Sequence, residues 1–210
     1  RIGQAIIKIP DGIEVKHELV GVGEHLRDHI NAPIKFHMKR EDLSYNKRMQ
    51  GLGPAWQVLR YIFQKRGFMS LPSAPMLAFL RTRDNMETPD VQMHIVPYAV
   101  KNYKKRQLHD FPGITMAVYQ LRPESLGSIH IQSPLASEQP AINFNFLSDQ
   151  IDRDTMLGGV KKSRQIMDTN AMKEVRGDEF LPGREVETDD QIFDYIRRTA
   201  ETAYHPIGTC

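Results

Sequence analysis

Residues 140–167, PAINFNFLSDQIDRDTMLGGVKKSRQIM, decide the fold class because the apolar pattern changes period within them. Before Ser148 the chain has the composition of a strand. After it, Met156, Val160 and Met167 recur at helical spacing and would line one face of a helix. Ser148 can cap this helix, and the aspartates of its first turns are favourable against the helix dipole. The stretch therefore predicts a helix that follows a series of strands.

The sequence before this stretch predicts strands separated by turns. Residues 32–39, APIKFHMK, alternate apolar and polar side chains as a half-buried strand does. Further strands are predicted within residues 13–19, 76–82, 90–98, 113–121 and 127–133. The turn residues Pro112, Gly113, Pro123 and Gly127 allow consecutive strands to reverse and to pair antiparallel.

Two more helices are predicted from their first residues. Gly53-Pro54 opens one, because proline suits the first helical position, and it should end near Gly67. The other begins at Thr188, whose spacing to Gln191 makes a capping box. Apolar residues at helical spacing are expected to be buried: Leu59, Ile62 and Phe63 in the first helix, and Ile192, Ile196 and Ala200 in the second. Strands followed by helices indicate an α+β fold, a mainly antiparallel sheet covered by helices on one side.

Composition excludes several classes of protein. The 210 residues are 40% hydrophobic with a net charge of +2, which suits one sizeable core and gives no support for a nucleic-acid partner. The basic run KNYKKR, residues 101–106, is expected to be a solvated loop, with a membrane-surface or nucleic-acid patch as the alternative. A single cysteine, Cys210, excludes an internal disulfide. No apolar run approaches the ~20 residues of a membrane-spanning helix.

The first residues lack the basic, apolar and small-residue order of a signal peptide. We therefore expect a cytoplasmic location, although sequence missing before Arg1 would leave export open.

Two candidate ligand motifs are weak. Gly21-Val22-Gly23 begins like a dinucleotide-binding loop, but Leu26 stands where the third glycine should be, so a tight turn is expected instead. His25 and His29 are four residues apart, the one opening for a metal site, and no third ligand is evident. We therefore expect no metal.

The segment TAYHPIGTC, residues 202–210, has the composition of a working loop. Pro206 favours an extended backbone at His205, Gly208 frees the following turn, and the predicted helix anchors the segment from behind. An imidazole held in this way suits a base. From the residues alone, a hydrogen-bonded structural role is an equal alternative.

Three stretches together resemble the glucose-methanol-choline (GMC) oxidoreductase family, most closely its choline dehydrogenase-like branch: residues 21–29 (GVGEHLRDH), 127–167 and 179–210. In that family a flavoprotein oxidises an alcohol to an aldehyde or ketone, with hydride passing to FAD. The family's N-terminal G-x-G-x-x-G and the segment beyond H-P-x-G-T-C are absent. The resemblance implies an internal fragment lacking most of the FAD-binding domain. Residues 1–30 would end an FAD-domain segment, 31–200 would form the substrate-binding domain, and 201–210 would start the catalytic loop.

The resemblance also implies roles for individual residues. His205 matches the family's catalytic histidine, which accepts or shares the alcohol proton. Tyr204, His94 and Tyr98 match residues that line the alcohol pocket. His37 stands where choline-oxidising relatives carry a glutamate, so an uncharged primary or aromatic alcohol is expected as the small-molecule substrate.

FAD would be bound mainly by parts of the parent absent from this chain. The electron acceptor stays open. The alternative is a fragment or degenerate relative without catalysis, which binds a small molecule or a partner.

Overall fold

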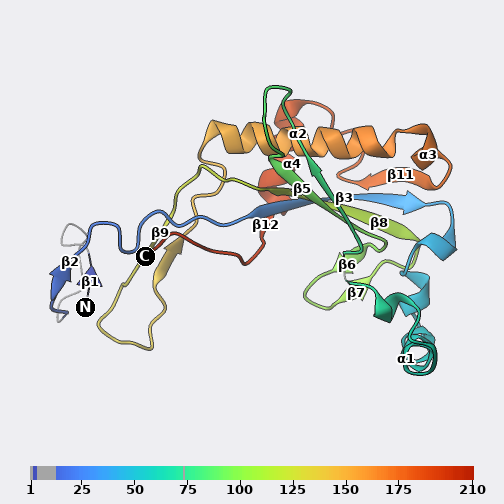
Figure 1. Ribbon diagram of the computed structural model, residues 1–210, viewed down its shortest axis with the longest axis horizontal. Helices are drawn as coiled ribbons and strands as arrows, with labels where there is room; N and C mark the ends of the chain where they lie inside the picture. Colours follow the sequence, from blue (N-terminus) through green and yellow to red (C-terminus); the bar gives the residue numbers. More distant parts are fainter. Residues whose placement is uncertain (1, 4–12, 73) are drawn as a thin grey trace.

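β3 (Ile30–Met38) lies inside a six-stranded antiparallel sheet in the computed structural model, which describes residues 2–3, 13–72 and 74–210. The sheet order is β11 (Arg176–Leu181), β3, β8 (Gly113–Gln120), β5 (Val91–Val96) and β4 (Met76–Leu80), with β12 (Glu201–Thr202) on the edge of β3 that β11 also uses (Figure 1). The strands predicted at residues 32–39, 76–82, 90–98 and 113–121 are confirmed.

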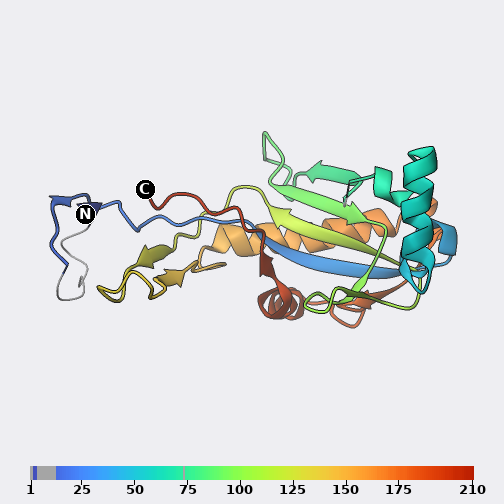
Figure 2. The ribbon, with the colours of Figure 1, turned by 90° about the horizontal axis from the view of Figure 1, so that it is seen from below.

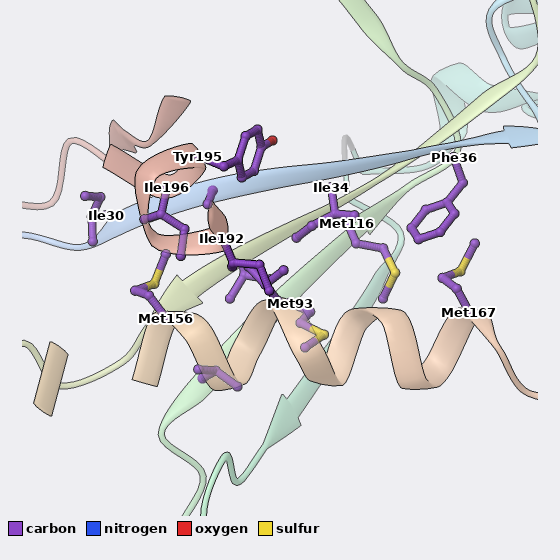
Figure 3. Packing of buried hydrophobic residues seen from close by; sticks show 14 of the residues in the cluster. Ile30, Ile34, Phe36, Met93, Met116, Met156, Met167, Ile192, Tyr195 and Ile196 are labelled. Atoms are coloured by element: carbon purple, nitrogen blue, oxygen red, sulfur yellow. The ribbon is translucent and has the colours of Figure 1, made fainter. Parts of the chain in front are cut away.

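Two helices, α2 (Gln150–Met167) and α4 (Asp189–Thr199), supply the layer that closes the core. α2 runs along one face of the sheet, with α4 packed beside it (Figure 1). Figure 3 shows the side chains buried between these helices and the sheet, including Ile34, Phe36, Met93, Met116, Met156 and Ile196. Gly159 permits the close approach, since a Cβ there would lie 2.4 Å from Cγ1 of Val118. The α+β prediction is confirmed.

The predicted caps of these helices are partly correct. Thr188 and Gln191 form the expected capping box at α4. The prediction for α2 is wrong by one residue, because Asp149, and not Ser148, is the cap. Its carboxylate accepts the Ile151 N–H at 2.8 Å.

α1 (Gly53–Gln64) starts where the sequence predicts, but the prediction of its buried face is wrong. Gln57 is the buried side chain of this helix, whereas Leu59, Ile62 and Phe63 are exposed. α1 contacts chiefly two short 3-10 helices, η2 (Lys47–Met49) and η3 (Phe68–Ser70), and it does not lie on the sheet.

An elongated part extends away from the sheet and carries β1 (Ile2–Gly3) and the C-terminus (Figures 1 and 2). β1 pairs with β2 (His17–Glu18), the only strand formed within the described part of residues 13–19. Residues 127–133 do contain a strand, β9 (Ser128–His130). It pairs with β10 (Ala141–Asn143) and not with the main sheet.

Several small elements complete the described chain. The basic run at residues 101–106 lies in a hairpin of β6 (Val100–Asn102) and β7 (Gln107–Leu108). The others are η1 (Glu41–Leu43) and α3 (Asn170–Lys173). Within residues 2–3, 13–72 and 74–210, no helix has both the length and the apolar content needed to cross a bilayer.

Candidate active site

A pocket of about 520 Å³ lies on the face of the sheet opposite α2. Side chains alternate along a strand, so the residues that do not face α2 point into this space. β3, β5 and β8 form its floor, and β12, the C-terminal segment and the β6–β7 hairpin form its walls. Its floor residues are Asn31, Pro33, His94, Val96, Thr115, Ala117 and Tyr119.

Four tyrosines line this pocket: Tyr98, Tyr103, Tyr119 and Tyr204. Burial raises the pKa of the first three phenols, and Glu201 adds to the effect at Tyr103. Their hydroxyls are therefore protonated at neutral pH and can donate hydrogen bonds. Tyr204 is exposed and has a positive φ of 61°, an uncommon conformation for a tyrosine.

His94 lies on the pocket floor beside Tyr119, with their ring centroids 4.4 Å apart. Its Nε2 accepts a hydrogen bond from the Nε2 amide group of Gln92 at 2.9 Å. Burial lowers the pKa of His94, and the nearby charge of His205 lowers it further. The imidazole of His94 is thus neutral at neutral pH, a state that can both accept and donate a hydrogen bond.

The backbone of His205 is held by Asp28, a buried carboxylate that is 3% exposed. Asp28 Oδ1 accepts the N–H of His205 at 2.9 Å and that of His29 at 2.7 Å. Its second oxygen accepts the hydroxyl of Thr202. Ionised carboxylates make the stronger class of hydrogen bond to amides, so this contact fixes the loop to the start of β3.

The segment after His205 is fixed as well. Arg27 and Ile207 exchange backbone hydrogen bonds of 2.9 Å each. Gly208 has a φ of +103°, and a Cβ there would lie 2.0 Å from the carbonyl oxygen of His25, so only glycine fits. The His205 ring stays exposed, edge-on to His29 with centroids 5.6 Å apart. The loop therefore presents an accessible imidazole on a fixed backbone.

The structure brings most of the sequence-predicted site residues together. Tyr204, His94 and Tyr98 line the pocket. His205 is not a lining residue, but it follows Tyr204 in the chain and is near enough to His94 to lower its pKa. It does not bring His37 there. That ring packs against Phe111 and Phe180, with centroids 4.4 and 4.7 Å away. His37 faces the same side as Pro33, but four residues along a strand place it about 13 Å further on.

Charged residues of the pocket were missed by the sequence reasoning. Glu201 and Arg106 line the pocket, from a two-residue strand and from the basic run. Lys35 is buried nearby. Its Nζ donates to the Val100 carbonyl at 2.7 Å and lies 5.2 Å from the Tyr103 ring centroid. Burial lowers the pKa of Lys35, an effect that Glu201 opposes. The site therefore combines one carboxylate with two basic groups.

The glycine turn does not provide a phosphate cradle. The Gly23 N–H donates to the Thr209 carbonyl at 2.8 Å, and a Cβ on Gly23 would lie 2.6 Å from the Ile129 carbonyl oxygen. The turn braces the C-terminal segment, as the tight-turn prediction implies. Nor do the residues that the structure describes form a group of three or more His, Cys, Asp or Glu suited to a metal. The glycine turn is thus filled by the chain's own backbone and leaves no room for a phosphate.

The sheet and its helix layer define an α+β domain whose fold is shared by solved structures. The chain superposes on the crystal structure of formate oxidase with a TM-score of 0.81 at 19% identity, over 100% of this chain and 41% of that one. Pyridoxine 4-oxidase from Mesorbium loti gives 0.73 at 17% identity, over 99% and 36% of the two chains.

Sequence comparison gives the family. The model of the GMC oxidoreductase family matches residues 123–210. The oxygen-dependent choline dehydrogenase of Photobacterium profundum is 31% identical over 209 residues, 100% of this chain and 36% of that protein. Its counterpart from Escherichia coli is 32% identical and is covered over 37% of its length. The chain belongs to the GMC oxidoreductase family, as the sequence indicated, and it spans a little over a third of these relatives.

Proposed function

We propose that this chain is the substrate-binding portion of an FAD-dependent enzyme that oxidises an alcohol to an aldehyde or ketone. The observation that carries the proposal is the convergence of Tyr204, His94 and Tyr98 on one pocket, with the backbone of the next residue, His205, held by Asp28. In this proposal residues 1–30 and 201–210 lead to the FAD domain, and residues 31–200 form the substrate-binding domain.

The residues of this chain bind the alcohol and move its proton. The pocket receives the organic part of the substrate, with its hydroxyl directed toward His205. His205 accepts or shares the hydroxyl proton, a role for which an accessible imidazole on a fixed backbone is suited. His94 and a neighbouring tyrosine orient the oxygen through hydrogen bonds. FAD would be held by the remainder of the protein and would supply the acceptor for the hydride of the carbinol carbon.

The charges of the pocket favour an uncharged primary or aromatic alcohol. Glu201 would attract a cationic alcohol such as choline, and tyrosine faces would add to the attraction. Arg106 lines the same pocket, however, and the buried Lys35 lies near Tyr103. These two positive groups offset the carboxylate, so a quaternary ammonium gains little here while an apolar or aromatic group can pack against the tyrosines.

Alcohol-dependent reduction of flavin in the full-length protein tests the proposal. The protein would be mixed without oxygen with benzyl alcohol, n-butanol or choline, and bleaching of the flavin absorbance would be followed. We expect benzyl alcohol or n-butanol to bleach the flavin faster than choline. Fastest reduction by choline would contradict the substrate class only. No reduction by any alcohol would contradict the enzymatic function and favour a non-catalytic binding module.

A titration of the 210-residue chain with FAD tests the division of the site. Because the glycine turn is occupied by Thr209, we expect no stoichiometric binding in flavin fluorescence. Tight binding would show that this chain holds the cofactor, and that the glycine turn does more than support the C-terminal segment.

A further inference from the structure

α1 exposes its apolar face and buries a polar residue, the reverse of an ordinary surface helix. A helix of a globular protein buries its apolar stripe and exposes its polar face. In α1 the polar Gln57 is 6% exposed, whereas Trp56 is 63% exposed and Phe63 is 81% exposed. Trp56, Leu59 and Phe63 follow one another at spacings of three and four residues and so share one face. An exposed apolar face of this kind marks a surface that interacts with a membrane or another protein.

α1 lies at the far end of the molecule from β1 and Cys210 (Figures 1 and 2). None of its residues belongs to the hydrophobic core, and its principal contacts are with η2 and η3. Burial within the described chain therefore does not explain its apolar face.

The surroundings of α1 are basic. No Asp or Glu occurs between Leu43 and Arg83, and Arg60, Lys65 and Arg66 lie within or just after the helix. Arg48, before the helix, lies beside Asp42 and is not counted with them. Lys65 extends over the Tyr61 ring, with its Nζ 5.2 Å from the centroid. An apolar face bordered by cations is the composition of helices that lie in the interface of anionic membranes.

We propose that α1 binds the surface of a membrane containing anionic phospholipid. The side chains of Trp56, Leu59 and Phe63 enter the boundary between headgroups and acyl chains, and Lys65 and Arg66 pair with lipid phosphates. At 12 residues the helix lies in the interface and does not span the bilayer. A second copy of the chain is a poorer occupant, because the same basic residues would face each other across the contact.

Vesicle binding tests this inference, with Trp56 as the reporter because it is the only tryptophan of the chain. The chain would be titrated with vesicles of phosphatidylcholine and phosphatidylglycerol, and with phosphatidylcholine alone. We expect a blue shift of Trp56 emission and co-sedimentation, both stronger with phosphatidylglycerol. The L59D/F63D variant should lower the partition coefficient about tenfold or more. The K65E/R66E variant should abolish the preference for phosphatidylglycerol while leaving the apolar face intact.

The matched control is Ile142→Asp, since Ile142 is 52% exposed on β10, far from α1. It should bind vesicles like the unchanged chain. Equal loss in the control, unchanged binding of both α1 variants, or an α1-dependent dimer without vesicle binding would each overturn the inference. So would a full-length protein that does not bind vesicles, because another part of it would then cover the helix.

Discussion

Replacing Asp28 with asparagine should loosen the His205 loop without disturbing the core. The carboxylate accepts two backbone amides, those of His29 and His205, through one oxygen and the Thr202 hydroxyl through the other. Asparagine has the same shape. Its oxygen can keep both amides, and the hydroxyl can turn to accept from the new NH₂ group. The main loss is therefore the charge of the acceptor.

The magnitude follows from the number of bonds affected. A hydrogen bond to a charged group contributes about 1.5–3 kcal/mol and a neutral one about 0.5–1.5 kcal/mol, so two weakened amide bonds amount to about 2 kcal/mol. If the loop opens locally, amide hydrogen exchange at His205 and His29 should accelerate about 10- to 30-fold. Asp28→Ala removes the acceptor altogether and should leave the two amides unprotected.

Asp152→Asn is the matched control. Asp152 is 1% exposed and also accepts three hydrogen bonds, from Gln120, Glu124 and Ser125, but it contacts neither His205 nor His29. It should lower the free energy of unfolding and leave exchange at His205 unchanged. Unaltered exchange at His205 in Asp28→Asn, or the same acceleration in the control, would refute the role of Asp28 as a positioning residue.

Three further predictions concern other titratable groups. Burial raises the pKa of Tyr195 to about 12, whereas an unfolded tyrosine titrates near pH ~10. The stability from this protonated phenol is complete below pH ~10 and lost as pH rises toward 12, so Tyr195→Phe should flatten the alkaline decline in urea unfolding. His205→Ala should raise the pKa of His94 in an NMR titration, and an unchanged titration would contradict their proximity. Glu179→Gln removes the negative charge that lies 2.6 Å from the largely buried Arg164, and it should lower the unfolding free energy by about 3–5 kcal/mol; a loss below ~1 kcal/mol would contradict this.

The main sheet and its helix layer could be predicted because their signals are local. β3 alternates side chains with period two, and the capping box of α4 lies within four residues. β11 was missed because RGDEFL carries glycine and three charges and shows no clear alternation. The periodicity of α1 correctly grouped its apolar residues on one face. Periodicity alone does not tell whether that face is buried against the core or exposed.

Much of the site depends on contacts that a single sequence does not encode. Asp28 accepts a hydrogen bond from His205, 177 residues away, and no motif near either residue indicates this contact. Tyr103 and Arg106 lie in a run whose charge suggests solvent, yet the hairpin brings both to the pocket. His37 shows the converse. It lies on the expected face of β3. Whether a residue of that face reaches the pocket depends on how far along the strand the pocket extends, which the sequence does not show.

The rate of flavin reduction by alcohol in a His205→Ala variant tests the central claim most directly. The full-length variant, purified with its FAD, would be mixed anaerobically with the best alcohol of the panel and compared with the parent and with His37→Ala, a histidine outside the pocket. We predict a fall of about 10²- to 10⁴-fold for His205→Ala, the usual contribution of a positioned acid or base, and little change for His37→Ala. An unchanged rate in His205→Ala would contradict the assignment of His205 as the group that takes the alcohol proton.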